Sequence, residues 1–461
     1  MAVLYSPADI PFMVAANDAP LAWKEVAAYQ CDGTNDQIEI NNAIAALPTN
    51  GGSILLSPGT FNVSSSIVIE KDNISVFGQG TGQRTGATQT GVGTKIQAVA
   101  GLTTAVILVH RSDSLRVVYG VHLENFTIDG AYIGTDTNGV TFRSNRGFIQ
   151  RVHIHRCTGY GVFVRGYTAA ETGDVRWETY DTQLAFVQIG DCYNTGARET
   201  ATAGGGFYAG LEASDLHIVG CVFFNNYDNV RIGAGSQQFT NTHTYDAVRY
   251  NIWFDNAGSR TKLVNLKIEG AGNHGVLIDG TTLGTSDIQI VGCNLKNNGD
   301  AVTNTADHIH ILGPADHSRV LIVGNSFSKD TATANLTRYA INMPTNDARY
   351  ALIVGNSFGS DTHYGTGRVN DGTSGAGKAI IQHNYGTNYL DANGGTISIA
   401  NGGTITHGLW RTPTRYAVTP TVAGHIVAVT AASSTTLTVS LLNHDGTTIS
   451  TPENVVWWAE A

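Results

Sequence analysis

One short pattern returns along this chain at intervals close to 30 residues. LIVGNSF occupies residues 321–327 and returns at 352–358, and IVGC occupies residues 218–221 and returns at 290–293. Alignment matches Cys221, Asn265, Cys293, Asn325, Asn356 and Asn384 at spacings of 44, 28, 32, 31 and 28, with weaker matches upstream at Asn125, Arg151 and Phe186. Repeats of this length indicate a solenoid, a propeller or an array.

Each repeat unit reads as three short β-strands. In the unit at residues 261–280, TKLV, NLKIEG and GVLIDG alternate apolar and polar residues, and Gly, Asn and Asp mark the turns. Three such strands make one coil of a solenoid, whose inward residues stack on those of the next coil. A propeller blade needs four antiparallel strands, and the units are too short for that. The chain is therefore predicted to be an all-β parallel β-helix of roughly ten coils.

A different pattern precedes the coils. Thr34 and Gln37 have the spacing of a capping box, and Ile40, Ala43 and Ile44 share one face of the helix that would follow. A short amphipathic helix here would cover the open end of the solenoid, where strand edges and core are otherwise exposed.

The order DGTND, amphipathic helix, GGSILLSPGTF and ISVFGQG within residues 31–80 resembles the N-terminal cap of the pectate-lyase-superfamily β-helices. Phage tailspikes and related polysaccharide depolymerases belong to that group. The resemblance implies a right-handed β-helix over 31–391, after an N-terminal extension of residues 1–30. It also implies a parallel homotrimer. It does not select a reaction, because the superfamily contains lyases, hydrolases, epimerases and non-catalytic members.

The coil pattern stops near residue 391. Residues 392–461 contain short Thr- and Val-rich runs and end in VVWWAEA, a pattern similar to small C-terminal β domains of phage tail proteins. We predict a separate β domain there. Trp457 and Trp458 are expected in its core or in an interface, because Trp is usually largely buried.

Charge and composition exclude several classes of protein. A formal net charge of -10 argues against a general nucleic-acid binder. Residues 1–18 lack the pattern of a signal peptide, and no run is long enough to span a bilayer, so membrane insertion is not expected. These features fit a virion tail protein assembled inside its host and extracellular after release.

The cysteines are expected to be buried small hydrophobic residues. Their odd number and the lack of CxxC spacing disfavour a disulfide framework or a zinc site. The five are Cys31, Cys157, Cys192, Cys221 and Cys293.

Aligning the third strand of each unit predicts one charged face. The outward pairs are Thr141 and Arg143, Phe163 and Arg165, Gly210 and Glu212, Arg231 and Gly233, Leu277 and Asp279, His308 and His310, and Ala340 and Asn342. Arg143, Arg165, Arg231 and His310 are predicted to bind acidic sugars or hydroxyls. Arginines on successive strands would repel one another without an anionic ligand. The alternative is a solvated ladder of Arg–carboxylate pairs.

Glu212 and Asp279 are the predicted acid and base of this face. With one coil between them they would lie roughly 9–10 Å apart, near the upper end of the range of about 6.5–9.5 Å for inverting glycosidases. If residues 234–262 form an extra coil, the separation becomes about 14 Å and the assignment fails.

Two long segments, 167–183 and 234–262, read as insertions that could wall a groove. Trp177, Tyr250 and Trp253 are predicted to contact sugar rings, although each could equally pack as an ordinary loop residue. Three carboxylates in or beside these segments are reserve catalytic candidates: Asp174, Glu178 and Asp255.

A second cluster falls on the middle strands and could supply the base of a lyase. It consists of His153, His155, Lys267 and Glu269. His308 and His310 share a strand face but lack a third ligand, so no metal is predicted. Ca²⁺ stays open, but no clear cluster offers the six to eight oxygens it prefers.

The resemblance and the charged face together predict an endo-acting glycoside hydrolase, a tailspike-like depolymerase of a bacterial surface or extracellular glycan. The first alternative is a metal-free lyase acting on a polymer that contains uronate. The second is a non-catalytic glycan-binding or structural tail fibre.

Overall fold

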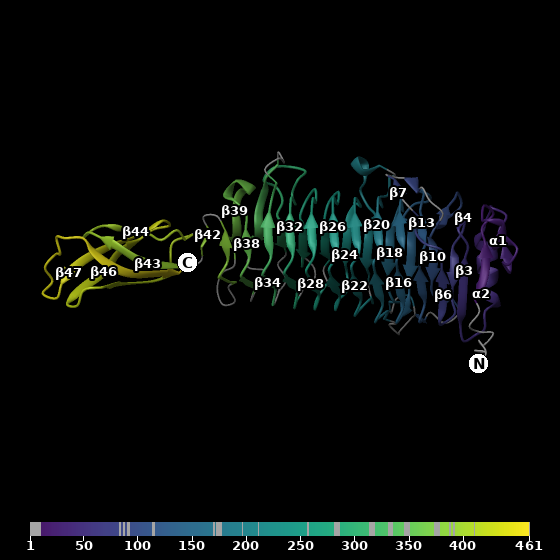
Figure 1. Ribbon diagram of the computed structural model, residues 1–461, viewed down its shortest axis with the longest axis horizontal. Coiled ribbons are helices and arrows are strands. Elements are labelled where there is room, and N and C mark those ends of the chain that lie inside the picture. The colour runs from purple at the N-terminus through teal and green to yellow at the C-terminus, as the bar shows by residue number, and fades with distance from the viewer. Residues whose placement is uncertain are drawn as a thin grey trace.

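The computed structural model describes residues 11–82, 84–85, 88–89, 93–112, 116–168, 171, 178–195, 197–210, 212–255, 258–280, 286–312, 319–330, 335–344, 351–372, 379–386, 389–390, 392–409 and 411–460. It shows an elongated right-handed parallel β-helix, with helices at its N-terminal end and a small antiparallel β domain at its C-terminal end (Figure 1). The predicted fold class is therefore confirmed.

Three parallel sheets form the sides of the β-helix, and each full coil supplies one strand to each sheet in the order A, B, C. Sheet A contains, in spatial order, β2 (Tyr29–Gln30), β1 (Phe12–Ala15), β3 (Gly52–Leu56), β6 (Ile74–Phe77), β12 (His122–Glu124), β16 (Phe148–Gln150), β19 (Gln183–Ala185), β22 (His217–Val219), β25 (Gln238–Thr240), β28 (Lys262–Val264), β31 (Gln289–Val291), β34 (Leu321–Val323), β37 (Leu352–Val354) and β40 (Ile380–Gln382).

Sheet B follows sheet A after a turn that is two residues long in most coils. It contains β4 (Gly59–Val63), β9 (Thr94–Ala98), β13 (Thr127–Asp129), β17 (His153–His155), β20 (Gln188–Gly190), β23 (Val222–Phe224), β26 (His243–Tyr245), β29 (Lys267–Glu269), β32 (Asn294–Lys296), β35 (Ser326–Ser328), β38 (Ser357–Phe358), β41 (Tyr385–Gly386) and the antiparallel β42 (Tyr389–Leu390).

Sheet C has the longer strands, and it carries the charged face. It contains β5 (Ile67–Ile69), β10 (Ala105–Val109), β14 (Asn138–Phe142), β18 (Tyr160–Val164), β21 (Gly205–Ala209), β24 (Asp228–Ile232), β27 (Ile252–Asp255), β30 (Val276–Asp279), β33 (Ile309–Leu312), β36 (Thr337–Met343) and β39 (Tyr364–Asp371). Short strand pairs outside these sheets are β7 (Arg84–Thr85) with β8 (Thr88–Gln89), and β11 (Val118–Tyr119) with β15 (Ser144–Asn145).

The core is a set of inward columns, in which each residue stacks on its register partner in the next coil. In sheet A, Ile218 pairs with Phe239, Phe239 with Leu263, and Leu263 with Ile290, all fully buried. Many strands of sheets A and B are three residues long, so each of these contributes one inward side chain. Burial of these columns removes apolar surface from water along the whole solenoid.

The turn from sheet A to sheet B explains the repeat found in the sequence. Its first residue adopts a left-handed backbone conformation, and its second points inward. Asn325, Asn356 and Asn384 are consecutive inward residues, and each side chain bonds to the next along the solenoid. The alignment of Asn265 with them was wrong by one residue, because the inward residue of that coil is Leu266. Asn125, Arg151 and Phe186 also occupy the left-handed position, one residue before the inward one.

Residues 234–262 are not a loop insertion. They contain β25, β26 and β27, a complete coil that pairs in register with the coils on both sides. The spacing of 44 residues between Cys221 and Asn265 therefore covers two short coils rather than one long unit. Helix η2 (Arg198–Thr200) lies between β20 and β21, and η3 (Asp361–His363) lies between β38 and β39.

A helix covers the first coil, as the sequence predicts, but the capping box does not form. The helix α2 (Gln37–Ala46) buries Gln37, Ile40, Ala43 and Ile44. Thr34 bonds to Asp32 instead, and Gln37 bonds to Ser64. Strands β1 and β2 extend sheet A, and helix α1 (Leu21–Lys24) lies between them in the chain, so residues from Phe12 onward are part of the β-helix structure.

The C-terminal domain consists of two antiparallel sheets around their own core. One contains β43 (Ala392–Ile399), β48 (Glu453–Glu460) and β45 (Arg415–Pro420); the other contains β44 (Thr404–Thr406), β47 (Thr436–Asn443) and β46 (His425–Ala432). Trp457 lies in this core, whereas Trp458 is 43% exposed on the outer side of β48, so only the first is a core residue.

The structure also bears on the cysteines and on membrane-spanning helices. All five cysteines are buried free thiols, as predicted. Among the described residues, no helix has the length and apolar character needed to cross a membrane.

Candidate functional site

The outer face of sheet C carries one continuous column of side chains. Register pairing runs through Thr141, Phe163, Tyr208, Arg231, Trp253, Leu277, His310 and Asn342. The predicted placement of Arg231, Leu277 and Asp279 on this face agrees with the structure. Three other alignments were wrong by two residues: Tyr208, His310 and Asn342 occupy the positions that were assigned to Gly210, His308 and Ala340.

His308 shows what this error changes. It is fully buried, and its Nδ1 lies 3.1 Å from Asn298 Nδ2. Burial lowers its pKa to about 3, so the ring is neutral. His308 is therefore a core residue and not part of the outer face.

Five arginines along this face each have a carboxylate partner. Arg143 and Arg165 both pair with Glu171, at 3.3 and 2.5 Å. Arg231 Nη2 lies 2.5 Å from Asp255 Oδ2. Two further pairs join Arg249 to Asp228 and Arg338 to Asp307. The repulsion that suggested an anionic ligand is thus relieved within the chain, as in the alternative of an Arg–carboxylate ladder.

Aromatic rings lie between these charged groups. Phe163 and Tyr208 stack with their centroids 4.9 Å apart. Two guanidinium groups lie over the Trp253 ring, with Cζ of Arg231 4.3 Å and Cζ of Arg249 4.6 Å from its centroid. Such cation–π contacts hold both the indole and the cations in defined positions. The face therefore alternates rigid aromatic surface with fixed hydrogen-bonding groups.

Asp255 and Asp279 are direct neighbours on this face. Both end their strands, and β27 and β30 pair in parallel so that the two residues are register partners. Neighbouring strands lie about 4.8 Å apart. Arg231 donates to Asp255 from Nε at 2.9 Å as well as from Nη2, while its Nη1 donates to Tyr160 at 3.0 Å.

The prediction that one coil separates Glu212 from Asp279 is wrong. Strands β21, β24, β27 and β30 follow one another in sheet C, which places three strand spacings, about 14 Å, between the two residues. Glu212 also lies beyond the end of β21, at the corner that leads to sheet A, where its carbonyl accepts a hydrogen bond from Thr179. Within one chain the two carboxylates cannot act as the predicted pair.

Glu212 lines a separate polar cavity of about 290 Å³ with Glu178, Asp215 and Arg260. Glu178 is hydrogen-bonded to Ser214 across this corner. The reserve residue Asp255 is on the sheet C face, and Glu178 is not. Trp177 and Asp174 lie outside the described residues.

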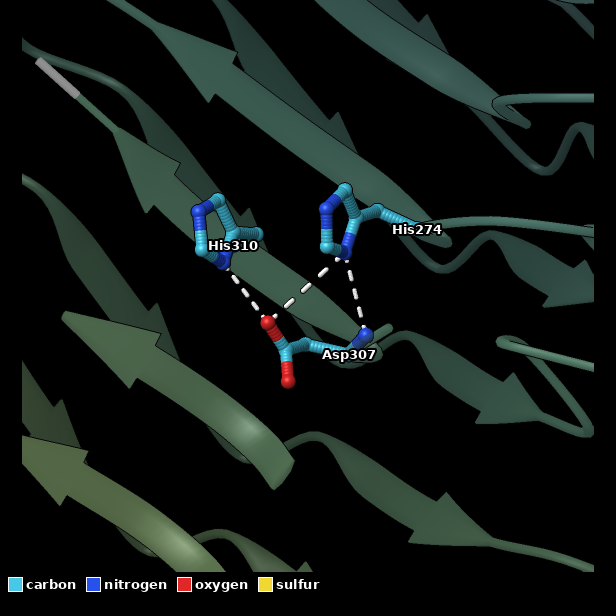
Figure 2. Close-up of side chains that lie close together, drawn as sticks. All are labelled: His274, Asp307 and His310. Carbon is cyan, nitrogen blue, oxygen red and sulfur yellow. Dashed lines mark hydrogen bonds and ion pairs between the residues drawn. The ribbon is translucent and has the colours of Figure 1, made fainter. Parts of the chain in front are cut away.

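His274, Asp307 and His310 form a buried cluster at one end of this face (Figure 2). His310 Nδ1 lies 2.6 Å from Asp307 Oδ2, and His274 Nδ1 accepts the backbone N–H of Asp307 at 3.0 Å. Burial lowers the pKa of His274 to about 3, so this ring is neutral, with its proton on Nε2. The prediction that no third ligand lies near His308 and His310 was wrong for His310, because Asp307 lies three residues earlier in the same coil and His274 comes from the preceding coil.

The cluster does not fit a metal ion as it stands. Arg338 donates two hydrogen bonds to Asp307, at 2.9 and 2.6 Å, and Asn342 donates a third at 2.8 Å. A cation would face the Arg338 guanidinium, and the lone pair of His274 Nδ1 is already used. The geometry is instead that of an Asp–His dyad, in which Asp307 accepts the Nδ1 proton of His310.

The rings of the dyad continue into the aromatic surface. His274 stacks on His310 with centroids 4.4 Å apart, and Tyr250 stacks on His274 at 5.9 Å. Tyr250 also lies beside Trp253, at 5.9 Å. The two aromatic residues predicted from the 234–262 segment, Tyr250 and Trp253, thus lie together on the sheet C face.

The middle-strand cluster lies on another side of the solenoid. His153 and His155 stack on β17, and Lys267 and His243 both contact Glu269 on β29. These residues face outward from sheet B and do not join the sheet C face. Four strand spacings, about 19 Å, separate β17 from β29, so the prediction that the four residues form one cluster is wrong.

No family model matches the chain, and no curated protein matches its sequence. Several solved structures share its fold. The tailspike protein of E. coli bacteriophage HK620, solved with a pentasaccharide, has a TM-score of 0.57 at 12% identity, over 92% of this chain and 89% of that one.

Two carbohydrate-active enzymes are also similar. The Mannuronan C-5 epimerase AlgE4 A-module of Azotobacter vinelandii has a TM-score of 0.51 at 16% identity, over 80% of this chain and 100% of that one. The DFA-IIIase of Arthrobacter chlorophenolicus A6 has a TM-score of 0.51 at 11% identity, over 82% and 92%. The chain therefore shares the right-handed parallel β-helix fold of these proteins, which the N-terminal cap motif implied.

Proposed function

We propose that this protein is an endo-acting glycoside hydrolase that binds a polysaccharide along the outer face of sheet C. The observation that carries the proposal is the register pairing of Asp255 with Asp279, beside Trp253 and Tyr250. Paired carboxylates next to aromatic surface are what hydrolysis of a glycosidic bond requires.

The two carboxylates have different surroundings, which suggests different roles. Asp255 receives two hydrogen bonds from Arg231, which hold its carboxylate in a fixed position on the face. We assign Asp255 as the nucleophile and Asp279 as the acid that protonates the leaving oxygen. The strand spacing of about 4.8 Å is close to the 5–5.5 Å between the carboxyl groups of retaining enzymes, so we propose retention of configuration.

The balance of charge on the face bears on the substrate. Because Arg143, Arg165 and Arg231 are neutralised by Glu171 and Asp255, the face does not require an anionic polymer. We therefore propose a neutral bacterial surface or extracellular glycan. The hydrolysis proposed here uses the protein's own carboxyl groups and no cofactor. Similarity to a phage tailspike solved with a pentasaccharide supports a virion tail protein that acts outside the cell. We also propose that this protein is a homotrimer.

The test uses a panel of bacterial capsular, O-chain and secreted polysaccharides. New reducing ends and the absorbance of unsaturated products are measured for the wild type, Asp255→Asn and Asp279→Asn. The matched control is Glu269→Gln, which alters a paired strand carboxylate on sheet B. We expect new reducing ends without absorbance, a loss of at least 100-fold in each aspartate variant, and full activity in the control. Full activity in either aspartate variant would contradict the assignment.

The Asp307–His310 dyad favours one second candidate, a metal-free lyase acting on uronate. In such a reaction Nε2 of His310 would take the proton from the sugar carbon, while an arginine would neutralise the uronate. Products that absorb in the near ultraviolet, together with loss of activity in His310→Gln, would support the lyase. If no glycan in the panel is cleaved, both enzyme proposals fail, and a non-catalytic glycan-binding protein is the remaining candidate.

A further inference from the structure

The turn between sheets A and B contains one residue that breaks its own pattern. In nine of the ten coils with this two-residue turn, the left-handed position is Asn, Gly, Arg or His, whereas the tenth has Phe186, with a φ of 55°. A bulky side chain rarely adopts this conformation, because its Cβ crowds the backbone. The aromatic ring is also 58% exposed, so burial in the core does not offset that strain.

The ring of Phe186 forms one side of a pocket of about 330 Å³. Asn125 and Arg151, from the same turn in the two preceding coils, line it together with His153 and Gln188, which are register partners in sheet B. Arg151 is fixed by hydrogen bonds to Asn125, at 2.8 Å, and to Glu124. The Arg151 guanidinium and the Asn125 side chain are therefore held in place before any ligand binds.

The next coil leaves room for the ring. It has Gly220 at the same position, where an added Cβ would lie only 2.8 Å from Cε1 of Phe186. The ring thus rests over a position without a side chain. Strained backbone that persists without a gain in packing is a reason to look for a function at that site.

We propose that this pocket is a second carbohydrate site, which binds one pyranose ring by stacking on Phe186 and by hydrogen bonds to Arg151 and Gln188. Exposed aromatic surface flanked by fixed polar groups suits a sugar, which offers both an apolar face and hydroxyl groups. The pocket lies at the edge between sheets A and B, away from the sheet C face. The proposal of this second site rests on the proposed function in one respect only: the sugar would be a unit of the same polysaccharide.

A contact with a second copy of the chain is less consistent with these surroundings. The core of a protein interface is a continuous apolar patch. The neighbours of Phe186 along this corner are Asn125, Arg151 and Gly220 instead.

The test replaces Phe186 with the residue that other coils use. Phe186→Asn matches Asn125, Asn241 and Asn265 in the same turn, so the variant is expected to fold and to raise Tm by roughly 1–3 °C. The matched control, His383→Asn, also introduces Asn at the left-handed position of this turn, but in the last coil, far along the solenoid. Binding is measured by saturation-transfer NMR with the methyl α-glycosides of glucose, galactose and mannose and with N-acetylglucosamine.

We expect at least one of these sugars to receive signal from the wild type and from His383→Asn, with a loss of at least fivefold in Phe186→Asn. Equal signals in all three proteins, or no signal from any sugar, would overturn the proposal. So would dissociation of an oligomer by Phe186→Asn in analytical ultracentrifugation, because the ring would then be an interface residue. These measurements need no turnover, so their failure is distinct from failure of Asp255 and Asp279 as catalytic residues.

Discussion

Asp307 offers the sharpest test of the electrostatics at the candidate site. Its carboxylate is fully buried and accepts hydrogen bonds from Arg338, His310, Asn342 and the backbone N–H of Tyr339. Burial alone would raise its pKa, but the bonds from Arg338 and His310 outweigh burial and lower the pKa from 3.8 to about 2. The folded protein therefore holds this proton more weakly than the unfolded chain does.

The size of the effect follows from that pKa. A pKa lowered from 3.8 to about 2 corresponds to roughly 2–3 kcal/mol of stability, at 1.36 kcal/mol for each pKa unit. Because the folded pKa is depressed, this stability is fully present well above pH 4 and is lost as the pH falls through about 2. Near pH 3, about half of it should remain. The substitution Asp307→Asn removes the titrating group and with it this contribution.

The measurement is guanidinium-induced unfolding of the wild type and Asp307→Asn, followed by circular dichroism at pH 7 and at pH 3. We expect the variant to be less stable than the wild type by roughly 2–3 kcal/mol or more at pH 7, and the difference to narrow by about 1 kcal/mol at pH 3. Asp287→Asn is the control, since Asp287 pairs with the exposed Arg319 and should change stability by less than about 0.5 kcal/mol at either pH. A gap that is equal at both pH values, or wider at pH 3, would refute the reasoning.

Two further predictions test the stacked asparagines of the core (Asn325, Asn356 and Asn384) and the aromatic surface of sheet C. Asn356→Leu removes four side-chain hydrogen bonds in the core and should lower the free energy of unfolding by about 4 kcal/mol. The control Asn265→Gly, at a left-handed turn position, should lower it by less than about 0.5 kcal/mol. Equal losses for the two variants in denaturant unfolding would contradict the stabilising role of the stacked asparagines. Trp253→Ala should raise KM about tenfold on a cleaved polysaccharide, an effect of about 1.4 kcal/mol. Trp253→Phe should have a KM closer to that of the wild type, because it keeps an aromatic ring. An unchanged KM in the alanine variant would show that Trp253 does not contact the substrate.

The period of two in each strand predicts which face a side chain occupies, but not its position along the strand. The misplaced residues of sheet C illustrate this limit. Assigning Gly210 where Tyr208 belongs is a slip of two residues, which preserves the predicted face only for residues that lie inside a strand. The same slip brought His308 onto the surface in the prediction, although the structure buries it at the corner. Positions along a strand depend on pairing with neighbouring coils, which a single repeat does not specify.

The number of coils decides which charged residues become neighbours. The two coils between Cys221 and Leu266 each consist of three short strands joined by tight turns. Each is therefore shorter than the repeat of about 30 residues seen elsewhere in the sequence. With that coil unrecognised, Asp279 would lie beside Arg231, and Glu212 would come within reach as its partner. With the coil in place, Asp279 lies beside Asp255, a residue ranked only as a reserve candidate. The carboxylate pair is thus a consequence of stacking between distant parts of the chain, and composition or motif alone could not place it.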